Sequence, residues 1–167
     1  LRDWVGTVSP AGAVGGSGAI TLSPGGTLTV DDSVGLGVLN RLNAAAGVAR
    51  AMTLQGGAYT FIGNTFRNSS ETLGILTPGT GAGVITITPN GGIGLQTGIS
   101  VPSIGTVAAG AQLLLRGTNL GTPAGTQVAT FASTTGPTFV GAATANLAVT
   151  GTINKGILPW MIVDTSA

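Results

Sequence analysis

The stretch that decides the fold is Gly25-Gly26-Thr27-Leu28-Thr29-Val30, together with Ala19-Ile20-Thr21-Leu22-Ser23-Pro24 directly before it. Apolar and hydroxyl side chains alternate along both segments, and this period of two is typical of β-strands with one buried face. The residues Ser23-Pro24-Gly25-Gly26 between the two runs are turn formers. The stretch therefore predicts a unit made of a strand, a small turn and a second strand.

The same unit recurs along the 167 residues, with further strand pairs expected, for example, at 51–54 and 58–63, at 104–107 and 112–115, and at 128–131 and 138–141. The second strands align on Leu28, Tyr59, Ile85, Leu113 and Phe139, with spacings of 31, 26, 28 and 26 residues. Repeats of this length are typical of stacked architectures, in which one unit covers the apolar stripe of the next. We therefore expect an all-β fold, a right-handed parallel β-helix or solenoid of about five to six irregular coils, in a single domain over residues 1–167.

Two alternatives remain open at this point. A β-sandwich of antiparallel sheets also fits short strands separated by turns. The segment 38–46 is expected to form one or two helical turns or a loop, whereas elsewhere the 30 glycines and 8 prolines interrupt almost every window of helical length. Residues 1–17 match no unit and are expected to form an N-terminal extension or cap.

The composition excludes several classes of function. The chain has six basic and five acidic residues, no His and no Cys. Disulfides, Cys/His metal sites and Ser-His-Asp triads are therefore impossible, and there are too few cations to follow a phosphate backbone. No apolar run is long enough for a transmembrane helix, and we expect no membrane span, no nucleic acid and no cofactor.

The few charged residues are candidates for chemistry. Adjacent carboxylates at Asp31 and Asp32 are expected to form a polar turn, and Glu71 is expected to pair locally with Arg67, four residues away. A polysaccharide-acting enzyme would need these side chains, with Arg116, in one groove. The segment 161–167 (Met-Ile-Val-Asp-Thr-Ser-Ala) imitates the Asp loop of aspartic proteases, but it has no second copy, so we expect Asp164 to cap a turn after a strand.

A family likeness covers roughly residues 18–167. Five segments follow one another in a characteristic order: Gly25-Gly26-Thr27-Leu28, Gly56-Gly57-Ala58-Tyr59, Ser69-Ser70-Glu71-Thr72-Leu73-Gly74, Gly117-Thr118-Asn119-Leu120-Gly121 and Gly156-Ile157-Leu158-Pro159-Trp160. This series resembles the passenger-type surface proteins built from autotransporter-associated β-strand repeats. The resemblance implies a secreted, cell-surface β-helix that serves as a stalk, adhesin or coat, and it brings no catalytic residues with it.

The sequence therefore favours a non-enzymatic extracellular structural protein, a surface stalk, adhesin or self-assembling fibre subunit, which is expected to be a segment of a longer secreted protein. Unpaired strand edges and few charges favour assembly of copies with one another. Trp4 and Trp160, near the two ends of the chain, are the candidate interface anchors. The alternative is a polysaccharide-acting or glycan-binding module, with a glycan or a host surface as its ligand.

Overall fold

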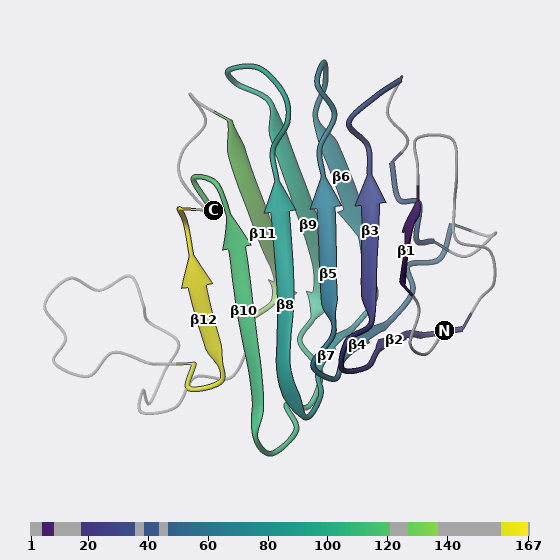
Figure 1. The fold of residues 1–167 in the computed structure, drawn as a ribbon, viewed down its shortest axis with the longest axis vertical. Helices are drawn as coiled ribbons and strands as arrows, with labels where there is room; N and C mark the ends of the chain where they lie inside the picture. The colour runs from purple at the N-terminus through teal and green to yellow at the C-terminus, as the bar shows by residue number, and fades with distance from the viewer. Residues whose placement is uncertain are drawn as a thin grey trace, which may run out of the picture.

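The computed structural model describes residues 5–8, 18–35, 39–43, 47–120, 127–136 and 158–166 (Figure 1). All regular elements in these ranges are strands. They are β1 (Val5–Val8), β2 (Ile20–Leu22), β3 (Thr27–Asp31), β4 (Met52–Leu54), β5 (Ala58–Ile62), β6 (Ser69–Thr72), β7 (Leu76–Pro78), β8 (Gly81–Thr88), β9 (Gln96–Ser103), β10 (Ala111–Gly117), β11 (Val128–Thr135) and β12 (Met161–Asp164).

The strands form three sheets, and every described pairing between them is parallel. The main sheet has six strands in the order β1-β3-β5-β8-β10-β12, and these stand side by side in Figure 1 with β12 and β1 at its two edges. The second sheet, β6-β9-β11, lies behind it, and the third sheet is β2-β4-β7. The four inner strands of the main sheet, β3, β5, β8 and β10, come from the first four repeats of the sequence, whereas the edge strands β1 and β12 lie outside the predicted units.

Alternation along the main strands decides which side chains enter the core. In β3, Leu28 and Val30 are buried, whereas Thr27 between the turn and Leu28 is exposed. The register pairs Leu28 with Tyr59, Tyr59 with Ile85 and Ile85 with Leu115, so buried side chains form a continuous column across the sheet. Burial of such apolar columns supplies most of the favourable free energy of the fold.

Turn glycines set the corner between the third sheet and the main sheet. Gly25 and Gly56 hold the same place in two successive repeats and both have a positive φ, 81° and 85°, which favours glycine. Gly57, one residue further on, is required for a different reason. A Cβ atom there would lie 2.7 Å from the Cβ of Leu22 and 2.8 Å from the main-chain oxygen of Gly26.

The prediction of a right-handed parallel β-helix of about five to six coils is wrong. The described strands form three open sheets of six, three and three strands, with no helix and no sheet that closes on itself. A regular coil contributes one strand to each sheet, but only β4-β5-β6 and β7-β8-β9 do so. Where other repeats need a third strand, the structure has a turn at Asn40–Asn43, with Asn40 at φ 55°, and a single bridge between Leu76 and Ile104. The parallel pairings also exclude the β-sandwich of antiparallel sheets.

Other sequence predictions have mixed outcomes. Within 38–46, the described residues form a loop and not a helix. Val5–Val8, inside the predicted N-terminal extension, form β1 and pair with β3. A strand predicted at 104–107 is reduced to the Leu76–Ile104 bridge, and the strand predicted at 138–141 lies outside the described residues. The third and fourth repeats differ in register from the sequence alignment, because Ile85 pairs with Leu115 and not with Leu113.

Candidate functional site

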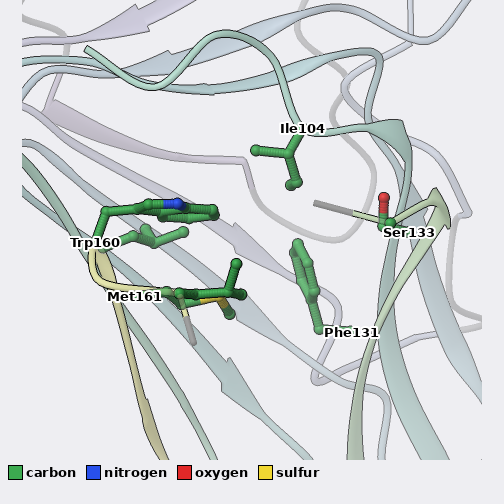
Figure 2. Close-up of a pocket in the computed structure, with 8 residues that line it drawn as sticks. Ile104, Phe131, Ser133, Trp160 and Met161 are labelled. Carbon is green, nitrogen blue, oxygen red and sulfur yellow. The ribbon is translucent and has the colours of Figure 1, made fainter. Parts of the chain in front are cut away.

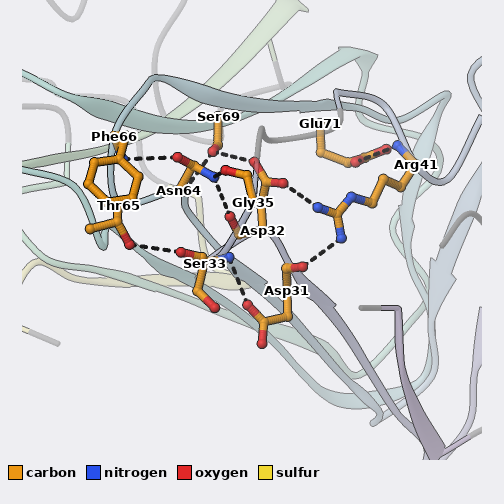
Figure 3. Close-up of polar contacts among 10 residues, drawn as sticks. All are labelled: Asp31, Asp32, Ser33, Gly35, Arg41, Asn64, Thr65, Phe66, Ser69 and Glu71. Carbon is orange, nitrogen blue, oxygen red and sulfur yellow. Dashed lines mark hydrogen bonds and ion pairs between the residues drawn. The ribbon is translucent and has the colours of Figure 1, made fainter. Parts of the chain in front are cut away.

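Polar side chains gather in the interior beside β6 (Figure 3). β6 places Ser69 and Glu71 at inward positions, where a core strand usually has apolar residues. The segments that follow β3 and β5 bring further polar groups to the same place. We call this set the buried polar cluster; it consists of Asp32, Arg41, Asn64, Ser69 and Glu71, which are all buried.

The ion pair between Arg41 and Asp32 is the centre of the buried polar cluster. The guanidinium of Arg41 contacts Oδ1 of Asp32 and also donates to the main-chain oxygen of Asp31 at 2.5 Å. The other carboxylate oxygen of Asp32 accepts a hydrogen bond from the Ser69 hydroxyl at 2.7 Å, and the Asn64 side chain donates to the main-chain oxygen of Asp32 at 2.8 Å. Both oxygens of this buried carboxylate therefore have partners, as a buried charge requires.

Glu71 is held by main-chain groups. Its two carboxylate oxygens accept hydrogen bonds from the backbone N–H groups of Arg41, at 3.0 Å, and Leu42, at 2.9 Å. Burial raises the pKa of Glu71 to about 7, and the two backbone hydrogen bonds and the Arg41 charge only partly offset this effect. Burial, and to a lesser degree the Glu71 charge, raises the pKa of nearby Tyr59 well above its usual range.

These contacts also cover one edge of the second sheet. Asn40 N–H donates to the main-chain oxygen of Ser70 at 3.3 Å, and the Asn40 side-chain oxygen accepts from Thr72 N–H at 2.8 Å. The loop thus occupies the free edge of β6 with polar groups. Covering an edge in this way is a known protection against pairing with another chain.

The buried polar cluster does not form the open groove that a polysaccharide-acting enzyme would need. The structure brings Asp32 and Glu71 together, but they are only 1% and 0% exposed. Arg67 is exposed, and the predicted Arg67–Glu71 pair is replaced by the contacts of Glu71 with the 41–42 backbone. Arg116 lies elsewhere, 3.2 Å from Asp164. The cluster therefore has the geometry of a structural element that fastens the 39–43 loop to β6.

The opposite end of the stack is apolar. Along the second sheet, Glu71 of β6 is followed in register by Ile99 of β9 and Phe131 of β11, so the inward column changes from polar to apolar. At the same end, β12 forms the edge of the main sheet and among the described strands pairs only with β10. We call β11, β12 and the side chains between them the open end.

A cavity of about 250 Å³ lies at the open end (Figure 2). Trp160 and Met161 face Phe131 across it, and the lining is completed by Ile104, Leu113, Ser133, Gly136 and Leu158. Trp160 is partly buried and packs against the core. Trp160 lies in the turn directly before edge strand β12, while Trp4 lies outside the described residues.

Edge strand β12 exposes apolar side chains at the open end. Val163 continues the buried column of Leu28, Tyr59, Ile85 and Leu115, yet it is 52% exposed. The neighbouring Ile162 is also exposed. Val163 loses its cover because, within the described residues, no further strand follows β12 in the main sheet. The apolar column therefore ends at an exposed surface whose side chains are apolar, like those of the core.

The remaining candidates have local structural roles. Asp31 accepts a hydrogen bond from Ser33 N–H at 2.9 Å, which confirms the polar turn at Asp31. The prediction is wrong for Asp32, which is buried in the ion pair with Arg41. Asp164 accepts from the backbone and the hydroxyl of Ser166, at 3.0 and 2.7 Å, and these bonds lower the pKa of Asp164. The expected cap after a strand is thus confirmed.

Sequence reasoning missed Arg41, Asn64 and Ser69 as members of one cluster. They are separated from Asp32 by 9, 32 and 37 positions, so no local motif joins them. The sequence does contain one sign of the cluster, because Ser69 and Glu71 occupy alternate positions of a strand where apolar residues are expected.

Within the described residues, no group of three acidic, His or Cys side chains is arranged to hold a metal ion. The described part of the chain also contains no helix that is long and apolar enough to cross a membrane.

Comparison of the chain with protein-family models, with curated proteins and with solved structures finds no match. The resemblance to autotransporter-associated repeats stays a prediction.

Proposed function

We propose that this chain is a non-enzymatic structural protein that assembles with copies of itself through the open end. The proposal rests on the exposure of the Val163 side chain. It stands in a column of buried core side chains, but it is half exposed on an edge strand. An exposed edge strand presents unpaired N–H and C=O groups to another chain, and here the apolar face continues with it.

The difference between the two edges of the second sheet supports the proposal. At β6, the loop 39–43 and the buried polar cluster occupy the edge. At β11, the inward side chain is Phe131, which lines the cavity of the open end. Proteins that must stay monomeric protect edges with charges, prolines or covering loops. The described part of this chain has such a device beside β6 and none of comparable polarity beside Phe131.

The charge of the whole chain supports the same function. Eleven charged residues among 167, with a net charge of +1, provide little electrostatic repulsion between copies. The Gly/Thr/Ser-rich, Cys-free composition and the resemblance to surface passenger proteins lead us to place this assembly outside the cell, as a stalk, adhesin or fibre subunit.

The proposal is tested by sedimentation velocity over a hundredfold range of protein concentration. We expect the natural chain to shift to larger species as concentration rises. Val163→Lys places a charge on the inward face of β12, and we expect it to weaken association at least tenfold, because a charge facing an apolar contact must be desolvated.

Val34→Lys is the matched control. Val34 is 59% exposed, close to the 52% of Val163, but it lies in the segment after β3 and not on an edge strand. We expect Val34→Lys to associate like the natural chain. A natural chain that stays monomeric over the whole range, or equal weakening by both lysines, would contradict the proposal.

A further inference from the structure

We propose that copies join head to tail, with β12 of one copy pairing in parallel with β1 of the next, so that Val163 lies beside Gly6. This inference rests on the proposed function, since it specifies the geometry of the same self-assembly. β12 and β1 are the two edges of one sheet, and each pairs with a single described strand, β10 and β3 respectively.

This pairing preserves both the parallel strand direction and the core face of the main sheet, whereas contact between two β12 edges changes one of them. All strands of the main sheet are parallel, so a second copy that is only translated along the sheet brings its β1 to β12 with direction and faces preserved. A twofold axis that relates two β12 strands cannot preserve both the strand direction and the faces of the sheet. An axis perpendicular to the sheet reverses the strand direction, and an axis along the strands places the core face of one copy beside the outer face of the other.

The register inside the sheet predicts the register between copies. Four consecutive pairings connect β3 to β12, and a fifth connects β1 to β3. Followed from edge to edge, they give three complete columns: Val5-Thr27-Ala58-Val84-Leu114-Ile162, Gly6-Leu28-Tyr59-Ile85-Leu115-Val163 and Thr7-Thr29-Thr60-Thr86-Arg116-Asp164. Head-to-tail pairing continues each column, and therefore places Ile162 beside Val5 and Asp164 beside Thr7 of the next copy.

The residue types at the joint are compatible with this register. β1 has the sequence Val-Gly-Thr-Val and has no charge. The one charged side chain of β12 is Asp164, which already has Arg116 at 3.2 Å within its own copy. Glycine at position 6 adds no side chain of its own beside Val163. The joint therefore brings an apolar edge to an uncharged one and leaves no new unpaired charge.

Head-to-tail contact has a consequence for the size of the assembly. A contact between two different surfaces leaves one of each unused at the ends, so growth continues unless the copies close into a ring. We therefore expect open chains of copies and not dimers.

Cysteine cross-linking tests the register, because the natural chain has no cysteine. Val5→Cys and Ile162→Cys are made as separate variants, mixed, and oxidised at a concentration at which the natural chain associates. We expect a disulfide-linked heterodimer in the mixture and at least tenfold less dimer with either variant alone. Within one copy the two positions lie five strand spacings apart, about 24 Å, so the double variant must give a ladder of linked copies and no internal disulfide.

Val8→Cys mixed with Ile162→Cys is the register control. Val8 lies three residues along β1 from Val5, roughly 10 Å away, and we expect at least tenfold less cross-linking. Thr7→Cys with Asp164→Cys forms a second in-register pair, for use if a variant of the first pair does not fold. Sedimentation of each variant confirms that it still associates.

The outcomes separate the two proposals. A dimer formed by Ile162→Cys alone, or no heterodimer from either in-register pair although the variants associate, would overturn head-to-tail pairing and leave self-assembly intact. If the natural chain does not associate at all, the proposed function fails and this inference fails with it.

Discussion

At the scale of single residues, burial decides what each ion pair contributes. The Arg41–Asp32 pair has side chains that are almost completely buried, whereas Arg116 and Asp164 are substantially exposed. A buried charge without its partner is far more costly than a solvated one. The few charges of this chain therefore differ greatly in their importance for stability.

We expect Arg41→Met to lower the free energy of unfolding by about 3–5 kcal/mol, because Asp32 keeps a buried negative charge but loses its cation. Urea unfolding followed by tryptophan fluorescence measures the change. Arg116→Met is the control, and it should leave the midpoint nearly unchanged. Equal effects of the two substitutions would show that burial does not distinguish the pairs.

Glu71 makes stability depend on pH. Because the pKa of Glu71 rises from 4.5 to about 7 on folding, the folded state holds a proton that the unfolded state has released between these values. The Glu71 contribution to the free energy of unfolding should therefore be complete at and below pH 4.5, fall as the pH rises to 7 and be absent above it. The total contribution of this group is at most roughly 3 kcal/mol.

Urea unfolding between pH 5 and pH 8 measures this dependence. Glu71→Gln is expected to lower stability at pH 5, because an amide cannot accept both backbone hydrogen bonds, and to flatten the curve. A natural chain that gains stability from pH 5 to pH 8, or a Gln variant with an unchanged slope, is incompatible with a proton held at Glu71.

Local sequence spacing was misleading at this residue. The four-residue separation of Arg67 and Glu71 predicted an ion pair, because residues four apart lie on the same face of a helix. Glu71, however, lies in strand β6 and points inward. Its real partners are 29 and 30 positions away. Contacts of this kind depend on how the repeats stack, and a single sequence contains no local signal for them.

At the scale of elements, small residues allow successive repeats to approach one another. Gly57 lies against the backbone of the preceding repeat, where a Cβ atom would be 2.8 Å from both the carbonyl carbon of Leu22 and the oxygen of Gly26. Backbone atoms in a paired sheet cannot move aside without disturbing the pairings of β2 with β4 and of β3 with β5.

We expect Gly57→Ala to lower the free energy of unfolding by roughly 1–3 kcal/mol through this overpacking. Gly92→Ala is the matched control, because a Cβ atom there meets nothing within 4 Å. Its effect should stay within about 0.5 kcal/mol. Thermal or urea unfolding of the two variants tests the close approach, which would be refuted by equal stabilities.

Strands were predictable where alternation and turn residues agree. The expected segments at 19–22, 27–30, 51–54 and 58–63 correspond to β2, β3, β4 and β5, and the alignment of Leu28, Tyr59 and Ile85 is the observed register. β9 was missed, because Gly98 and Pro102 interrupt its pattern. In a sequence window, glycine favours a loop. Here a Cβ atom at position 98 would meet Thr130, so close packing explains why glycine occurs inside this strand.

At the scale of the whole molecule, the repeats are unequal. A β-helix of about five to six irregular coils was predicted from spacings of 26 to 31 residues, but three open sheets of different sizes result. Repeat length shows that units stack, whereas the number of strands in each unit depends on local events such as the Asn40–Asn43 turn. Neither the polar covering of β6 nor the half-exposed Val163 could be derived before the stacking order was known.

These features make the two ends of the molecule different, and this difference is the basis of the proposed assembly. The central claim is that β12 gains a backbone partner when copies associate. Hydrogen–deuterium exchange of peptides covering Met161–Asp164, measured at low and high protein concentration, tests it most directly. We predict that amide exchange in β12 slows at least tenfold as concentration rises, while exchange in central strand β5 stays unchanged. If β12 exchanges at the same rate at every concentration, including those at which the chain associates, the claim is contradicted.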